Sequence, residues 1–160
     1  MQKLEKERDT LRDDVSYLQS QSMRNNLVFT GVVEDHTDGN EHADVTERKL
    51  RQHLQDAFKI AREVADSIRF ERVHRSPGSP FAGKTRNIIA KFTFFKDREM
   101  VRKSWKQLDA TQFRVFEQFP RDVIQKRRML FPQMKEARRL DKRAYLAYDT
   151  LYIDGTAVRA

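Results

Sequence analysis

The order of apolar stretches between residues 27 and 119 constrains the fold of this 160-residue chain more than any other feature. Short runs rich in β-branched and aromatic residues alternate with longer runs whose apolar residues recur at helical spacing. The predicted order is strand, helix, strand, strand, helix, strand, with a Pro/Gly-containing loop before the third strand. The predicted ranges are Leu27 to Val33, Glu41 to Phe58, Ile68 to Arg75, Asn87 to Phe95, Lys96 to Leu108 and Phe113 to Phe119. In the second helix, Met100, Val101, Trp105 and Leu108 are predicted to face inward.

This order predicts an α+β domain of the split βαβ, or ferredoxin-like, type: four antiparallel strands with two helices on one face. The loop from Ser76 to Arg86 and a short connector from Lys59 to Ser67 complete it. One face of such a sheet is left open. The RNA-recognition motif uses the same βαββαβ platform and presents stacking aromatic side chains on that face.

The stacking aromatic pair of that motif is missing from the central strands. On the first strand, Leu27 and Phe29 are predicted to point inward, and Val28 takes the outward position where an aromatic residue is usual. Alternation along the third strand predicts Ala90, Phe92 and Phe94 facing the helices, and Asn87, Ile89 and Lys91 facing outward. The open face therefore either binds through basic side chains or binds nothing, and both interpretations remain open.

The first 23 residues are predicted to form a coiled-coil helix. Leu4, Leu11 and Leu18 recur every seven residues, Val15 joins them at the second seam position, and Arg8 is a polar interruption. The pattern leaves two interpretations: a coil that joins copies of the chain, or a single amphipathic helix lying on the domain. It does not separate a dimer from a trimer.

Residues 120–160 predict a small α/β domain of one helix and a small sheet. Pro120 starts the helix, and Pro132 is expected to kink it or split it in two. Two short strands follow, Ala144 to Tyr148 and Leu151 to Val158, and Asp154-Gly155 is a strong hairpin signal within the second. The predicted apolar stripe of the helix comprises Val123, Leu130, Phe131, Met134, Ala137 and Leu140.

All of the net charge lies in the stretch from Arg98 to Arg143. That stretch has 14 Lys/Arg against 6 Asp/Glu, and the whole chain has 32 against 24, so the remainder is balanced at 18 against 18. Charge sorted in this way attracts a polyanion, most commonly nucleic acid. Its sharpest point is the triplet Lys126-Arg127-Arg128. The alternative is a helix face that is merely solvated.

Several other functions are not favoured by the sequence. There is no cysteine, and no apolar run approaches the roughly 20 residues that a membrane-spanning helix needs. His36 and His42 lie among acidic residues, which we interpret as a solvated loop rather than a metal site. No nucleophile-elbow or P-loop spacing is present. We expect a protein without cofactor, metal or catalytic site, located inside the cell.

Several segments together resemble the first-open-reading-frame protein of LINE-type retrotransposons. They are SMRNNLVFTGV, FERVHR, a Pro/Gly loop, NIIAKFTFFKDREMV, FPRDVIQKRRMLFPQMKEAR and LYIDG, in the order typical of that family. The resemblance implies a coiled coil over residues 1–23, a noncanonical RNA-recognition motif over 24–119 and a small C-terminal nucleic-acid-binding domain over 120–160. It further implies a homotrimer that coats element RNA in a cytoplasmic or nuclear ribonucleoprotein and acts as a chaperone during reverse transcription.

The resemblance also implies which residues bind single-stranded nucleic acid. They are Arg24, Asn26, Arg72, Arg75, Lys84, Arg86, Lys91, Lys126, Arg127 and Arg128, together with Arg143 and an aromatic residue that is either Tyr145 or Tyr148. The chain departs from the family at Val28, where relatives can carry an arginine, and in its much shorter coil. Leu4, Leu11, Val15 and Leu18 are the expected oligomerisation residues.

Two functional hypotheses follow from the sequence. The first is a single-stranded RNA- or DNA-binding chaperone that acts mainly through phosphate contacts with low sequence specificity. The second is a coiled-coil adaptor whose basic helix docks an acidic protein partner. The sequence does not decide between RNA and DNA.

Overall fold

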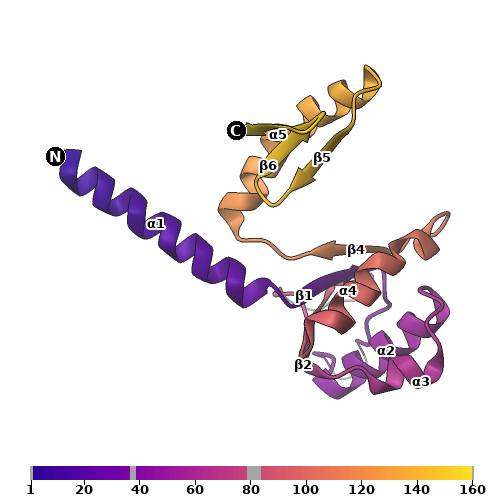
Figure 1. Ribbon diagram of the computed structural model, residues 1–160. Helices are drawn as coiled ribbons and strands as arrows, with labels where there is room; N and C mark the ends of the chain where they lie inside the picture. Colours follow the sequence, from indigo (N-terminus) through magenta and orange to yellow (C-terminus); the bar gives the residue numbers. More distant parts are fainter. Residues whose placement is uncertain (1, 37–38, 79–83, 160) are drawn as a thin grey trace. The chain divides into compact units, whose positions relative to one another are not determined.

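The computed structural model describes residues 2–36, 39–78 and 84–159 and has a mixed α+β fold, as predicted (Figure 1). The chain divides into two units, residues 23–118 and residues 1–22 with 119–160. Part of the predicted Pro/Gly loop, residues 79–83, lies outside the described residues. In the described ranges no helix has the length and apolar character needed to cross a membrane.

The first unit, residues 23–118, contains a four-stranded sheet and its helices. Their bounds are β1 Asn26–Thr30, α2 Ala43–Asp56, α3 Arg62–Ser67, β2 Phe70–Arg75, β3 Ile88–Phe92, α4 Phe95–Lys103, the 3-10 helix η1 Ser104–Leu108 and β4 Arg114–Glu117. The strands lie in the order β2-β3-β1-β4, and all neighbours are antiparallel. The predicted connector after α2 contains the helix α3, and the predicted second helix ends as a 3-10 helix.

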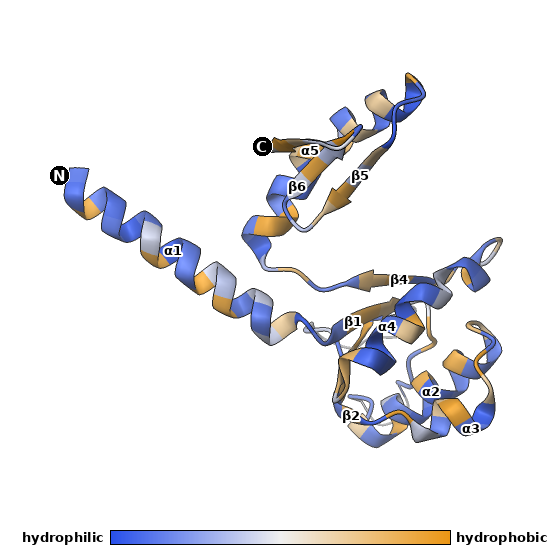
Figure 2. Cartoon of the chain, viewed as in Figure 1, coloured by the Kyte–Doolittle hydropathy of each residue, from blue (hydrophilic) through white to orange (hydrophobic). Residues whose placement is uncertain are grey.

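The core of this unit lies between one face of the sheet and the helices. Leu27 and Phe29 of β1 are fully buried against Leu50 and Leu54 of α2 and Val101 of α4. These residues recur at a spacing of two along the strands and three or four along the helices, which places each set on one side of its element. Figure 2 shows hydrophobic patches on helices that are otherwise largely hydrophilic.

Two aromatic residues that were predicted to face the core are instead exposed. Phe94 is 52% exposed because β3 ends at Phe92, so alternation no longer controls its direction. Trp105 is also 52% exposed because the change from α4 to the 3-10 helix at Ser104 alters the angle between successive side chains. Met100 and Leu108 pack on the core, as predicted.

The second unit contains α1 Gln2–Met23, apart from its last residue, together with α5 Arg121–Arg139 and the strands β5 Ala144–Ala147, β6 Thr150–Ile153 and β7 Thr156–Arg159. The three strands form an antiparallel sheet in sequence order. Leu130 and Ala137 of α5 pack on Ala144 and Leu151. Asp154 and Gly155 have φ of +49° and +84°, the positive values that a type I′ turn requires, so the predicted hairpin is confirmed.

Pro132 does not split the helix, contrary to one of the two expectations. α5 runs without interruption from Arg121 to Arg139, because Leu130, Met134 and Ala137 pack on the sheet on both sides of the proline. That packing compensates for the single backbone donor that proline removes. Two members of the predicted apolar stripe are exposed, Phe131 by 38% and Leu140 by 53%.

The predicted oligomerisation residues of α1 are exposed on the single chain. Leu4, Leu11 and Leu18 are 64–65% exposed, and Val15 is 52% exposed. No residue of α1 from Gln2 to Met23 is buried. Figure 2 shows α1 as a mostly hydrophilic helix with separate hydrophobic patches along it.

One buried titratable group in the first unit makes its stability depend on pH. His53 of α2 packs edge-to-face between Phe58 and Phe113, with ring centroids 5.5 Å and 4.6 Å away. Its Nε2 has no hydrogen-bond partner among the described residues. Burial lowers the pKa of His53 from 6.5 to about 4, because the cation cannot be solvated there.

We expect His53→Phe to flatten the pH dependence of unfolding. Because the pKa of His53 is lowered on folding, the unfolded chain binds more protons below pH 6.5, and stability falls as the pH falls from 6.5 towards 4. Across this pH range, the free energy of unfolding should fall by about 3 kcal/mol in the parent chain. Urea unfolding at pH 7.0, 5.5 and 4.5 measures it. The exposed His42→Ala is the control, and an unchanged slope in His53→Phe would contradict the assignment.

Candidate nucleic-acid interface

An apolar row crosses all four strands on the sheet face opposite the core. His74 of β2 pairs with Ile89 of β3, and Ile89 pairs in turn with Val28 of β1. Val28 then pairs with Phe116 of β4. Because successive strand residues alternate between faces, these side chains point away from the core. Phe116 is 53% exposed, whereas Ile89 is buried in the middle of the row. We call these four residues the open-face row.

Cationic and amide side chains border the open-face row. On one side, the next outward positions are Arg72 of β2, Lys91 of β3 and Asn26 of β1. Lys91 pairs with Arg72 on one neighbouring strand and with Asn26 on the other. Arg114 of β4 occupies the next outward position on the other side. Glu71, at the bulge of β2, lies 3.4 Å from the Lys91 ammonium, and both side chains are substantially exposed. Such an exposed pair contributes at most about 1 kcal/mol and leaves the border cationic.

His74 adds a neutral ring to the end of this row. Burial lowers the pKa of His74, and the nearby Arg72 guanidinium lowers it further. A His with a lowered pKa is uncharged at neutral pH. The open-face row therefore ends in a flat, uncharged imidazole on β2 and a flat phenyl ring on β4.

Arg75, predicted to bind nucleic acid, is instead buried within the first unit. Its side chain is 2% exposed and forms an ion pair with the fully buried carboxylate of Glu41. All five N–H donors of the guanidinium have acceptors. Nε donates to Glu41 Oε1 at 2.9 Å, Nη1 to the carbonyls of Val32 and Arg86 at 2.7 and 2.8 Å, and Nη2 to the Val33 carbonyl and Glu41 Oε2 at 2.8 and 3.3 Å.

Arg86, also predicted to bind, has the same kind of partner. Its guanidinium holds both carboxylate oxygens of Glu34, with Nη2 to Oε2 at 2.6 Å, and the Glu34 side chain is fully buried. Arg86 Nη1 donates to the carbonyl of Gly78 at 2.7 Å. We call the two pairs, Arg75–Glu41 and Arg86–Glu34, the arginine clamp.

The arginine clamp holds both carboxylates ionised. Hydrogen bonds from Arg86 keep the pKa of Glu34 below its ordinary value. Burial alone would raise the pKa of Glu41, but hydrogen bonds from Arg75 and from the Asp35 amide outweigh it and lower that pKa to about 2. The clamp joins the segment after β1 to β2 and to the residues before β3. Because both arginines are used in the fold, the expectation that they contact phosphate is not supported.

We expect Glu34→Gln to destabilise the first unit by about 3 kcal/mol, because removing one partner leaves a buried guanidinium unpaired. Glu71→Gln, which removes the carboxylate of the exposed pair, is the matched control and should change stability by less than about 1 kcal/mol. Urea unfolding at neutral pH gives both values. Equal stability of the two variants would show that the clamp does not hold the loops.

The other predicted residues of this unit lie at the surface. Lys84 is exposed, and its carbonyl is 2.9 Å from His36 Nε2. The Arg24 guanidinium lies 4.5 Å from the ring centroid of Phe95. Asn26 Nδ2 donates to Gln118 Oε1 at 2.7 Å, at the end of the cationic border. The predicted residues that remain candidates for binding in this unit are Arg24, Asn26, Arg72, Lys84 and Lys91.

The predicted triplet in the second unit does not share one face of α5. Successive helix residues are about 100° apart, so Lys126, Arg127 and Arg128 point in three directions. Lys126 lies 3.8 Å from Asp149. Arg127 lies 4.5 Å from the ring centroid of Phe119 and donates to the Tyr148 carbonyl at 2.8 Å, so it holds the start of α5 against the β5–β6 turn. Arg128 is exposed.

A second set of cations on α5 does share one face. Arg121, Arg128 and Lys135 recur every seven residues on the side away from the buried Val123 and Leu130. Neighbouring members are about 10 Å apart along the helix axis. All three are exposed, and none forms an ion pair within the described part of the chain. We call them the cationic ridge. Sequence reasoning singled out the contiguous triplet and overlooked this periodic set.

Tyrosine side chains of the second unit lie on the small sheet and at its β5–β6 turn. Tyr145 stacks on Tyr152 across β5 and β6, with centroids 5.3 Å apart and rings 18° from parallel. Tyr145 is 44% exposed, and Tyr148, which contacts Phe119 edge-to-face, is 39% exposed. The exposed Arg143 is fixed beside the hairpin because its amide donates to Asp154 Oδ1. Both candidate tyrosines are thus accessible. Sequence reasoning did not identify Tyr152, the stacking partner of Tyr145.

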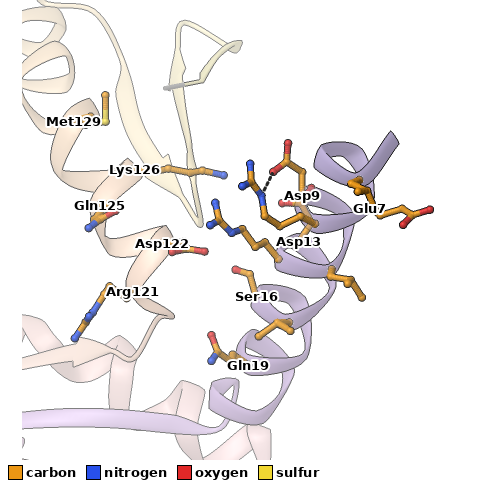
Figure 3. A pocket seen from close by; sticks show the side chains of 15 residues that line it. Glu7, Asp9, Asp13, Ser16, Gln19, Arg121, Asp122, Gln125, Lys126 and Met129 are labelled. Carbon is orange, nitrogen blue, oxygen red and sulfur yellow. Dashed lines mark ion pairs between the residues drawn. The ribbon is translucent and has the colours of Figure 1, made fainter. Parts of the chain in front are cut away.

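An open hollow in the second unit is bordered by side chains of α1 and α5 (Figure 3). Its border mixes Arg12, Arg121 and Lys126 with Asp13 and Asp122 among other residues. Mixed charge of this kind does not match a polyanion, so we assign no nucleic-acid site there.

Comparison with protein-family models finds no match for this chain, and comparison with curated proteins finds none either.

Proposed function

We propose that this chain is a single-stranded RNA- and DNA-binding protein that acts as a nucleic-acid chaperone in the ribonucleoprotein of a LINE-type retrotransposon. It acts by binding and is not an enzyme. The observation that carries the proposal is the cationic ridge, three exposed cations in line on one helix with no carboxylate partners in the described structure. A line of exposed cations attracts the repeated negative charges of a phosphate backbone.

The charge of the C-terminal segment supports the same proposal. Residues 119–160 contain 10 Lys/Arg and 5 Asp/Glu, an excess of +5 (10 − 5) in a short segment. Exposed tyrosine rings in the same segment, those of Tyr145 and Tyr148, offer stacking surfaces that accept any base. Binding through phosphates and ring stacking gives strong salt dependence and little sequence preference.

The sheet of the first unit supports a nucleic-acid platform as well. Its strand order, β2-β3-β1-β4, is that of a ferredoxin-like sheet, which the RNA-recognition motif shares. The open face has a cationic border at Arg72, Lys91 and Arg114. In this proposal residues 24–119 are a noncanonical RNA-recognition motif and residues 120–160 a second binding domain.

Self-association through α1 would strengthen binding to a long strand. The seam residues Leu4, Leu11 and Leu18 are exposed on one chain and would be buried in a coil of several chains. Linking several binding units raises their effective concentration on one strand. We propose a homotrimer, as the family resemblance implies, in a cytoplasmic or nuclear ribonucleoprotein.

We expect Arg121, Arg128 and Lys135→Ala together to weaken binding of a labelled 30-nucleotide single-stranded RNA. At about 0.7 released counterions per phosphate contact, loss of three contacts makes the log–log salt slope shallower by about two. Fluorescence anisotropy at several salt concentrations measures the slope.

The matched control removes three exposed cations from the first unit, Arg48, Lys96 and Lys106→Ala, and should leave the slope close to that of the parent chain. An equal loss in both variants would indicate general charge attraction rather than a track on α5. Absence of RNA binding, with tight binding to a folded acidic protein, would replace the proposal with the adaptor hypothesis.

A further inference from the structure

We infer that Phe116 is a base-stacking site: an unpaired base of the bound strand lies on its ring, on the outer strand β4 of the sheet. This inference rests on the proposed function and names a contact that neither the charge pattern nor the family resemblance contains. The sequence led us to expect an open face without stacking aromatics, because Val28 and Ile89 occupy the central positions. The structure places an aromatic ring in line with them, one strand further out.

The position of Phe116 distinguishes it from an ordinary exposed aromatic. A single exposed phenylalanine needs no functional explanation. Phe116, however, pairs with Val28 across the strands, and Val28 pairs with Ile89. Its ring is therefore one end of the open-face row, which continues to His74 and which we also call the floor of the site. Three strand spacings separate Phe116 from His74, roughly 14 Å in all. The floor is long and narrow, with a flat ring at each end.

The charges around the floor select the class of ligand. Arg72 and Lys91 lie on one side and Arg114 on the other, and the single carboxylate that pairs with this border in the described strands is that of Glu71. An apolar protein surface would bury these cations without partners, at a high desolvation cost. A nucleotide combines a flat ring for the floor with a phosphate for the border. A single strand is required, because a duplex keeps its base faces stacked internally.

The Phe116 ring is held at the surface and does not contribute to the packing of the core. Phe116 is absent from the hydrophobic core, whereas its neighbour Val115 packs against the core. The neighbour on the other side, Glu117, accepts a hydrogen bond from Arg98 Nη2 at 2.8 Å and so ties β4 to α4. Because Val115 and Glu117 are held on the core side of the strand, Phe116 between them faces solvent. Its replacement therefore leaves the core intact.

The test compares Phe116→Ala with Phe94→Ala, because the two side chains are 53% and 52% exposed in the same unit. We expect Phe116→Ala to lower affinity for a 30-nucleotide oligouridine roughly tenfold, the effect of one lost stacking contact, with an unchanged salt slope. Affinity for inorganic polyphosphate, which has no bases, should not change. Phe116→Tyr should restore RNA binding, and Phe94→Ala should match the parent chain.

A spectroscopic readout observes the stack directly. The chain has one tryptophan, Trp105, so the double variant Trp105→Phe, Phe116→Trp carries a single reporter at the site. Its fluorescence should be quenched by oligouridine and not by polyphosphate. Unaltered RNA affinity in Phe116→Ala, an equal loss on polyphosphate, or no quenching would overturn the inference while leaving the proposed function in place. No RNA binding by the parent chain would overturn both.

Discussion

Two buried ion pairs, Arg75–Glu41 and Arg86–Glu34, are the interactions on which the sheet unit depends. A desolvated guanidinium is tolerated only when its donors are satisfied, and Arg75 meets this condition with all five. Their acceptors come from the segment after β1 and from the residues just before β3. The clamp therefore fixes two loops relative to β2, and through β2 it fixes the edge of the open face.

The basic residues of the chain divide into those that form contacts within the fold and those that remain at the surface. Residues 24–118 contain 18 Lys/Arg against 14 Asp/Glu, and several of the acidic groups are committed to fold-forming pairs, such as Glu117 with Arg98. On α5, Arg127 is similarly committed to Phe119 and the Tyr148 carbonyl. Among the cations that remain at the surface, two sets are aligned: the border of the open-face row and the cationic ridge. Each set is organised by the periodicity of its element rather than by proximity in the sequence.

Much of the architecture was predictable because it depends on short-range periodicity. The core residues Leu27, Phe29, Ala90 and Phe92 were assigned correctly, since alternation holds wherever the strand is continuous. The predictions of side-chain direction and of element bounds were wrong where a regular helix or strand ended or changed to another type. Phe94 follows the end of β3, Trp105 lies in a 3-10 helix, and residues 62–67 form α3 within a predicted connector. The helix across Pro132 persisted because packing on the small sheet outweighs the local preference of proline.

By itself the sequence determined the α+β class, the approximate order of strands and helices, the hairpin at Asp154-Gly155 and the concentration of positive charge towards the C-terminus. These properties follow from residue type and spacing along the chain. Only the tertiary structure decided which charged and aromatic residues reach solvent. Arg75 and Arg86 were drawn into the fold because Glu34 and Glu41, distant in sequence, meet them there. Phe116 joined the open-face row because strand register, a long-range property, places β4 beside β1.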